Sequence, residues 1–205
     1  MDEQFHLAIS YQEDVPRELL SPLLEAFNNA ELIVKEDKRP RDIYAALEWA
    51  LPTVIIAYLT KPYFEAMLKE AGKEHYHLLK AGFLNMFEKI FGTKQRTFVQ
   101  RSNIFSLLGD TQDGKKLKCI FPEGIEKEQY SEALDELFEL ITTHHKDYPN
   151  DPITKMAEQL ENQRDMTIYI EFNTPKKLWI ILDPSKEARR QAEDQHRKRQ
   201  NMSDL

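Results

Sequence analysis

The clearest signal of the fold in this sequence is the segment Thr53 to Thr60, TVIIAYLT. Val54 to Ala57 are apolar without interruption and Leu59 continues the run, so the segment has no polar face. A strand of this kind is typical of a sheet that is covered on both faces, as in α/β proteins. We therefore expect residues 53–60 to form a strand inside a sheet.

Strand and helix signals alternate in the residues before this stretch. Apolar residues alternate with polar or small ones over residues 5–11, and the leucine-rich run that follows has helical spacing. A second strand is expected over residues 31–35 and a second helix over residues 42–50, separated by the charged loop Lys35 to Arg41. Right-handed β-α-β crossovers join parallel strands. We therefore expect three parallel strands, with the first and the third near the middle of the sheet.

The second half of the chain favours antiparallel pairing, so the sheet is expected to become mixed. Helical spacing covers residues 62–91, with breaks or bends near Gly72 and Gly82. The expected elements after it are a hairpin of residues 97–108 and 115–121, helices over 126–146 and 152–160, and strands over 166–172 and 178–182. We expect one mixed α/β domain over residues 1–183, followed by a polar, charged C-terminal helix or tail over residues 184–205.

Composition excludes several classes of protein. The 205 residues carry a formal net charge of −7, which argues against a surface that tracks nucleic acid along its whole length. The single cysteine, Cys119, cannot form an internal disulfide or a cysteine-built zinc site. The N-terminus lacks the basic and apolar regions of a secretory signal, and the longest apolar run is too short to span a membrane. We expect a soluble, cytoplasmic protein without membrane contact.

The motifs of common catalytic and cofactor sites are missing from the sequence. No glycine-rich phosphate loop follows either of the first two strands, and no Gly-x-Ser-x-Gly elbow occurs. Neither the pair His75 and His77 nor the pair His144 and His145 has the spacing of zinc ligands on a helix. Each histidine is better explained as hydrogen-bonded or solvated, and Cys119 as a small buried residue of a strand. No metal and no cofactor are expected.

Candidate binding residues follow from their position in the expected sheet. In open parallel sheets, ligands and partners bind at the carboxyl ends of the strands. The corresponding residues are Ser10, Tyr11 and Asp14 after the first strand, and Thr60, Lys61 and Tyr63 after the third. A solvated loop with helix-capping residues is the simpler explanation of the same positions.

Residues 5–80 also resemble a divergent Toll/interleukin-1 receptor (TIR) domain. The resemblance rests on Ala8-Ile-Ser-Tyr11 followed by Asp14, on Leu32-Ile-Val34, and on the apolar strand with Tyr63-Phe64 after it. It implies a flavodoxin-like, three-layer α/β fold built on parallel strands 5–11, 31–35 and 53–60. Members of that family either assemble through their surfaces in signalling or cleave NAD with a glutamate in the helix after the third strand. Glu70 and Glu65 are the catalytic candidates that this resemblance implies.

Two functions from different classes are therefore expected. The first is a protein-interaction module of signalling or defence type, which contacts a partner or a second copy of itself through loops at the strand carboxyl ends. The alternative is a TIR-type NAD glycohydrolase or nucleotide-binding enzyme, with NAD as its cofactor or substrate. A third possibility, nucleic-acid binding, depends only on Arg197, Lys198 and Arg199, for which a solvated tail is the simpler interpretation.

Overall fold

The computed structural model describes residues 5–29, 32–40, 54–67, 72–91, 105–122, 124–159 and 167–183, with the backbone alone for residues 65–67, 72–73 and 91. The expected helix 42–50, the candidate Glu70 and the C-terminal segment 184–205 lie outside these residues.

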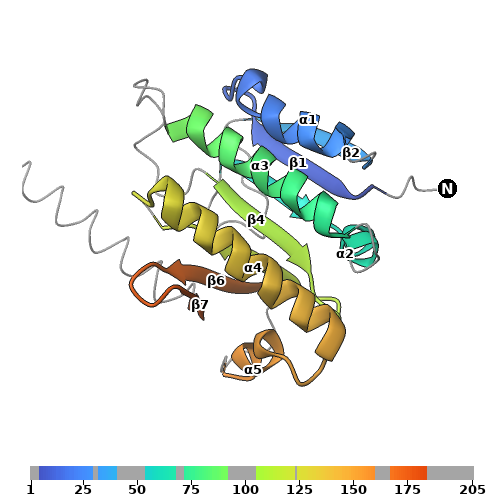
Figure 1. The fold of residues 1–205 in the computed structure, drawn as a ribbon, viewed down its shortest axis with the longest axis vertical. Helices are drawn as coiled ribbons and strands as arrows, with labels where there is room; N and C mark the ends of the chain where they lie inside the picture. Colours follow the sequence, from blue (N-terminus) through green and yellow to red (C-terminus); the bar gives the residue numbers. More distant parts are fainter. Residues whose placement is uncertain are drawn as a thin grey trace, which may run out of the picture.

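Seven strands in the described part of the chain form one sheet in the order β2-β1-β3-β4-β5-β6-β7 (Figure 1). The strands are β1 (Leu7–Gln12), β2 (Val34–Arg39), β3 (Ile55–Leu59), β4 (Phe105–Asp110), β5 (Lys116–Ile120), β6 (Thr167–Asn173) and β7 (Leu178–Ile181). The helices are α1 (Ser21–Asn29), α2 (Lys61–Met67), α3 (Gly72–Phe91), α4 (Lys127–Asp147) and α5 (Pro152–Glu158), with a 3-10 turn at Arg17–Leu19. The expected mixed α/β class is confirmed and is consistent with a flavodoxin-like arrangement.

The sheet is built from three β-α-β units. The parallel neighbours β1 and β2, β3 and β4, and β5 and β6 are each joined through one or two helices. Successive units meet in antiparallel pairs, β1 with β3 and β4 with β5, and β7 closes the sheet as the antiparallel neighbour of β6. Among the described helices, none is long and apolar enough to cross a lipid bilayer.

The expected parallel direction of the third strand is wrong, although its central place in the sheet is right. Leu7 lies opposite Leu59 and Tyr11 lies opposite Ile55, so β3 runs antiparallel to β1. The reason lies in the connection from β2. Strand β2 ends at Arg39, at the same end of the sheet at which β3 begins. Nη2 of Arg39 lies 3.4 Å from the carbonyl oxygen of Val54, the residue before β3. A chain that returns to the sheet at the edge it left must run in the opposite direction.

Strand β2 begins at Val34, later than the strand expected over residues 31–35, and most of it lies in the charged segment for which the sequence predicts a loop. Four of its six residues are exposed, and none is buried. An edge strand of this kind has solvent on both faces, so it needs no apolar alternation, and its charges also discourage pairing with other chains. Side-chain contacts hold it in place: Ser10 donates a hydrogen bond to Asp37, and Arg17 forms an ion pair with Glu36.

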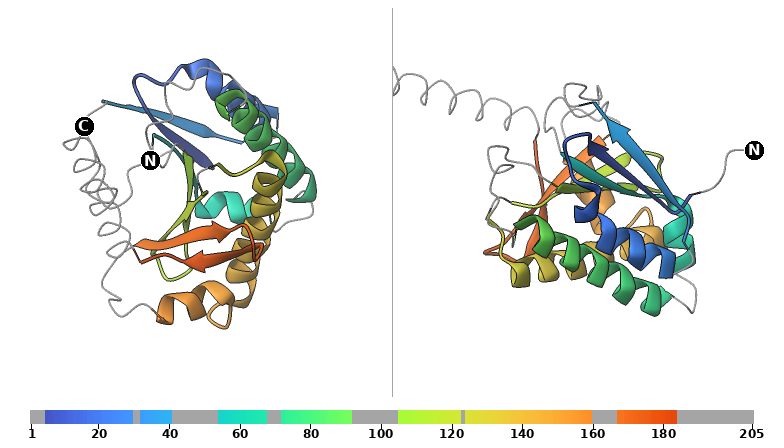
Figure 2. Two further views of the ribbon diagram at one scale, coloured as in Figure 1. Left: turned by 90° about the vertical axis from the view of Figure 1, so that its left-hand side faces the viewer. Right: turned by 90° about the horizontal axis from the view of Figure 1, so that it is seen from above.

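One face of the sheet carries helices α1, α3 and α4 side by side (Figure 2). The apolar core lies between these helices and the sheet, where the rings of Phe83, Phe105, Phe121, Tyr130 and Trp179 form one connected cluster. Strand β3 is buried on both faces, as expected, since Ile55 and Ile56 point to opposite faces and are 2% and 6% exposed.

Candidate functional site

The structure does not bring the six predicted binding residues together. Because β1 and β3 are antiparallel, the carboxyl end of β1 and the carboxyl end of β3 lie at opposite edges of the sheet. Ser10, Tyr11 and Asp14 are near one edge, whereas Thr60 and Lys61 are at the other. The paired part of β1 runs four residues along the strand, from Leu7 to Tyr11, so the two edges are about 13 Å apart. The six residues therefore do not share one edge, because their placement at the strand carboxyl ends assumed that the first and third strands were parallel.

Three of these six residues have structural roles. Tyr63 is fully buried against the rings of Phe27 and Phe64, and burial raises the pKa of its phenol well above the ordinary value. Tyr11 is also part of the apolar core. Thr60 is 6% exposed, and its hydroxyl lies 2.7 Å from the carbonyl oxygen of Phe5, which ties the end of β3 to the start of β1.

The other predicted residues keep contact with solvent. Lys61 and Asp14 are exposed, and Ser10 is half-buried. Of the two catalytic candidates, Glu65 lies in α2 and only its backbone is described, while Glu70 lies outside the described residues. The two catalytic roles therefore stay predictions of the resemblance.

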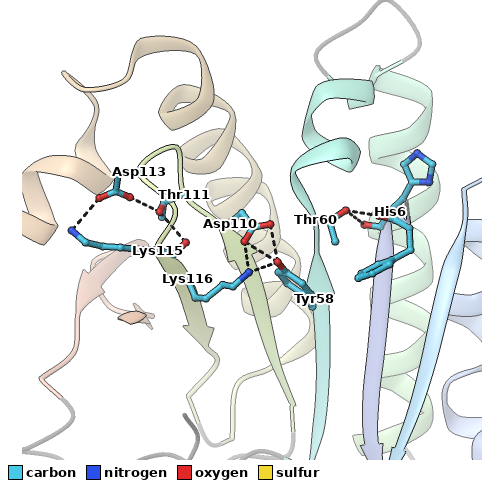
Figure 3. Close-up of polar contacts among 9 residues, drawn as sticks. His6, Tyr58, Thr60, Asp110, Thr111, Asp113, Lys115 and Lys116 are labelled. Atoms are coloured by element: carbon cyan, nitrogen blue, oxygen red, sulfur yellow. Dashed lines mark hydrogen bonds and ion pairs between the residues drawn. The ribbon is translucent and has the colours of Figure 1, made fainter. Parts of the chain in front are cut away.

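A polar cluster that the sequence analysis missed occupies the edge where β3 and β4 end and β5 begins (Figure 3). The hydroxyl of Tyr58 donates to the carboxylate of Asp110 at 2.8 Å. The ammonium of Lys116 donates to both Tyr58 and Asp110, and its Nζ lies 4.3 Å from the centre of the Tyr58 ring. We call these three residues the edge triad.

The electrostatics of the edge triad hold Tyr58 and Lys116 each in one protonation state. Burial raises the pKa of Tyr58 above its ordinary value, and Asp110 adds to this effect while Lys116 opposes it. Burial would lower the pKa of Lys116, but its contacts with Asp110 and Tyr58 outweigh this and raise it. At neutral pH the phenol is therefore neutral and the amine is charged, so neither is poised to transfer a proton. The arrangement suits recognition better than acid–base catalysis.

The tight turn between β4 and β5 continues this edge. Thr111 Oγ1 lies 2.5 Å from Oδ1 of Asp113, and Lys115 forms an ion pair with the other oxygen of Asp113 at 3.0 Å. Burial would raise the pKa of Asp113, but its contacts with Thr111 and Lys115 lower it. Gly114 has a φ of 81°, a left-handed conformation that glycine adopts without strain. The predicted hairpin with a glycine-ended loop is confirmed.

Two adjacent histidines at the end of α4 support this turn. The backbone N–H of Gln112 donates to Nε2 of His144 at 2.9 Å, and Nδ1 of His144 lies 2.8 Å from the carboxylate of Asp151. Asp151 is the N-cap of α5, and its carboxylate also accepts from the backbone N–H and the hydroxyl of Thr154. His144 is therefore fully hydrogen-bonded, as predicted, and has no nitrogen available for a metal.

A cleft of about 240 Å³ lies beside the turn. The residues that line it are Thr111, Asp113, Lys115, His144, Ile153, Thr154, Ala157, Glu158 and Ile168. No group of three or more His, Cys, Asp or Glu side chains in the described part of the chain is arranged to hold a metal ion. Cys119 is buried in β5, as predicted, and burial raises the pKa of its thiol above the ordinary value.

Only two of the three residues of the edge triad could have been placed together from the sequence. Asp110 and Lys116 flank the hairpin turn symmetrically and lie directly opposite each other, so the predicted hairpin could have paired them. Tyr58 is more than fifty residues away along the chain, and only the parallel pairing of β3 with β4 brings it beside Asp110. Comparison of the chain with protein-family models, curated proteins and solved structures finds no match.

Replacing Asp151 by asparagine is expected to lower the free energy of unfolding at pH 7 by about 1–2 kcal/mol. The amide can still cap α5, but it loses the charge-assisted hydrogen bond from His144. Burial would raise the pKa of Asp151, but hydrogen bonds from Thr154 and His144 lower it below its ordinary 3.8. The carboxylate therefore stabilises the fold above about pH 4 and loses this effect as pH falls through its lowered pKa. Urea unfolding at pH 7 and pH 3 measures both effects.

The matched control is Asp147→Asn, an exposed position at the same end of α4. Its effect is expected to stay within about 0.5 kcal/mol. Equal losses in the two variants, or a difference between Asp151→Asn and the wild type that is as large at pH 3 as at pH 7, would contradict this account of Asp151.

Proposed function

We propose that this protein is a cytoplasmic protein-interaction module that binds its partner through the edge formed by the edge triad and the adjoining turn Thr111–Lys115. The observation that carries the proposal is the geometry of the triad. An aromatic ring, a carboxylate and an ammonium group are partly exposed there and already held in place by one another. A signalling or defence role is the part of the proposal that rests on the TIR resemblance of residues 5–80.

Prearranged side chains favour binding because little conformational entropy is left to lose. Ordering a long side chain at an interface costs about 0.5–1.5 kcal/mol. Lys116 is already ordered by Tyr58 and Asp110, so a partner gains its contacts without that cost. Tyrosine is enriched among the residues that dominate binding energy, and fixed charges of both signs select a partner with the complementary pattern.

The same geometry supports binding over NAD cleavage. A glycohydrolase needs a carboxylate free to act at the reacting sugar, whereas Asp110 and Asp113 are each engaged by a lysine and a hydroxyl group. The alternative enzyme would depend on Glu70 or Glu65. Incubation of the purified protein with NAD, followed by measurement of released nicotinamide, tests it. Turnover that is lost in Glu70→Ala or Glu65→Ala would overturn the interaction module as the primary function.

Site-specific crosslinking tests the proposed surface. A photo-crosslinking residue is placed at Gln112, in the turn, or at Thr174, in the turn between β6 and β7 at the opposite edge. Crosslinked partners are recovered from the native host and identified, and the affinity of the recovered partner is then measured with purified proteins. Crosslinks are expected from Gln112 and not from Thr174. A partner that proves to be a second copy of this chain is checked by sedimentation.

Lys116→Met is expected to weaken binding of that partner about 30-fold, the loss that corresponds to a 2 kcal/mol hot-spot contact. The control is Lys177→Met, which removes a lysine that also forms an ion pair, with Glu132, but lies at the opposite edge. Binding should be unchanged in this variant. Equal weakening by both variants, or crosslinks only from Thr174, would show that the edge triad is not the interaction site.

A further inference from the structure

Strand β7 is the outermost strand on the side of the sheet opposite β2 (Figure 2). The N–H of Leu182 donates to the carbonyl oxygen of Tyr169 in β6 at 2.8 Å. Along an antiparallel pair, residues that bond to the neighbouring strand alternate with residues whose backbone groups point away from it. The even-numbered residues 178–182 therefore bond to β6, whereas the N–H and C=O groups of Trp179 and Ile181 point outward. No described strand pairs with these outward groups, which we call the open side of β7.

The two outer strands of the sheet differ in composition. Strand β2 is charged at every position from Lys35 to Arg39, which discourages pairing with other chains. The five residues from Leu178 to Leu182 are all apolar, and Leu178 is 42% exposed. Strand β7 is also firmly placed, because Nε1 of Trp179 donates to the carbonyl oxygen of Ala133 in α4 at 3.1 Å. An ordered, apolar outer strand is a template to which another strand can be added.

We propose that the open side of β7 pairs with the open side of β7 in a second copy of this chain, antiparallel and across a twofold axis beside Ile180. Only outward-pointing residues form the new hydrogen bonds, so Trp179 of each copy lies opposite Ile181 of the other. In this register Leu178 faces Leu182 of the second copy and the two Ile180 side chains face each other. All five apolar residues therefore meet apolar residues, which favours association.

The charges at the two ends of β7 select this partner and this register. Lys177 precedes the strand and Asp183 follows the apolar run, so antiparallel pairing places Lys177 of each copy opposite Asp183 of the other. The Lys177 side chain is 64% exposed although it forms an ion pair with Glu132, so it remains within reach of a second copy. A shift of the pairing by two residues would set Lys177 against Ile181 or Asp183 against Trp179. The second copy therefore fits best in the register centred on Ile180.

This contact lies on a different border of the sheet from the edge triad, which occupies the ends of the central strands. The dimer therefore goes beyond the proposed function, and each is tested separately. Thr174 directly follows β6, so two strand spacings, about 10 Å, separate it from a strand added beyond β7. A photo-crosslinking residue at Thr174 therefore reports on other partners and not on this dimer.

Sedimentation equilibrium and amide hydrogen exchange of the full-length protein, over about 1–200 µM, test the dimer. Dissociation is expected in the micromolar range, because one short strand pair buries less surface than a standard interface. The amides of Trp179 and Ile181 are expected to gain protection as the concentration rises, whereas the amide of Ile180 is protected throughout by its bond to β6. A monomer at every concentration would overturn the proposal. Protection of Trp179 and Ile181 that does not change with concentration would also overturn it.

Ile181→Pro removes one of the two N–H groups that each copy contributes to the contact. The dimer is expected to weaken about 30-fold, the effect of one hydrogen bond lost from each copy. The bonds between β6 and β7 stay, because the N–H of Ile181 points away from β6, and proline is tolerated in this position of an outer strand. Unchanged protection of the Ile180 amide confirms that the monomer keeps its fold. Dimerisation as strong as in the wild type would overturn the strand pairing.

Leu178→Glu tests the apolar side of the contact without a change in the backbone. Leu178 is already 42% exposed, so the monomer should fold, and a carboxylate opposite Leu182 of the second copy is expected to weaken the dimer about tenfold. The matched control is Ile33→Glu, at an apolar residue that is 51% exposed beside the other outer strand. This control should dimerise as the wild type does. Equal weakening by the two variants would show that β7 is not the dimer contact.

Discussion

Ala57→Asp is expected to abolish cooperative folding. Ala57 is fully buried at the centre of β3, and its neighbours across the sheet, Ile9 and Leu107, are buried apolar residues of the main core. A carboxyl group at this position finds no partner among these side chains, and the cost of burying it is several kcal/mol. The total stability of a domain is about 5–15 kcal/mol, so little or none would remain. Circular dichroism during thermal unfolding measures the outcome.

Ile56→Asp is the matched comparison, because Ile56 points to the opposite face of the same strand. Its neighbours across the sheet are Ser10 and Ser106, and the hydroxyl of Ser106 is buried without a partner among the described residues. A serine hydroxyl can donate to the new carboxylate and offset part of the desolvation cost, by about 1–3 kcal/mol. We expect Ile56→Asp to be destabilised but less than Ala57→Asp. The reverse order would contradict the assignment of the two faces of β3.

Gly82→Leu is expected to lower the free energy of unfolding by about 3 kcal/mol, at the upper end for overpacking a core. Gly82 lies inside α3, which continues through it, so its role is not the break expected from the sequence. A Cβ atom at this position would lie 2.7 Å from Cβ of Ala26 and 3.2 Å from the carbonyl oxygen of Pro22, both in α1. The two helices must separate to admit any side chain. Urea unfolding gives the loss.

A double-mutant cycle distinguishes this contact from a general effect of changing a glycine. Gly82→Ala is expected to cost less than Gly82→Leu, and its cost should fall further when Ala26→Gly makes room for the new methyl group. Gly109→Ala, whose Cβ would make only ordinary contacts with Phe64 at 3.8 Å, serves as the control. If Ala26→Gly brings no relief, the close approach of α1 and α3 does not explain the role of Gly82.

Elements with strong local signals were predicted close to their observed bounds. The helix expected over residues 126–146 is α4, and it begins with a capping box between Glu126 and Gln129. The helix expected after Asp151-Pro152 is α5, and its N-cap is Asp151. Helical spacing, capping residues and a glycine-ended turn act within a few residues of one another, so the sequence displays them directly.

The second strand shows where local reasoning fails. Its residues Lys35 to Arg39 are all charged, so no alternation of apolar and polar residues marks them as a strand. They are extended because their backbone pairs with β1 from Leu7 to Gln12. In the outermost strand of a sheet, backbone pairing with one neighbour is enough to hold the chain extended, since neither face of the strand needs to be buried.

The α/β class, the central place of the apolar strand, the hairpin and the helices α4 and α5 could be predicted from the sequence, because they depend on the hydrophobicity and the turn chemistry of neighbouring residues. The direction of β3 could be seen only in the folded chain. Because of that direction, the carboxyl ends of β1 and β3 lie at opposite edges, and Tyr58 lies beside Asp110 and Lys116. The physical reason is that an apolar strand buries equal surface in either direction. Its direction is selected only by the edge at which the connecting chain returns and by the neighbours it then meets.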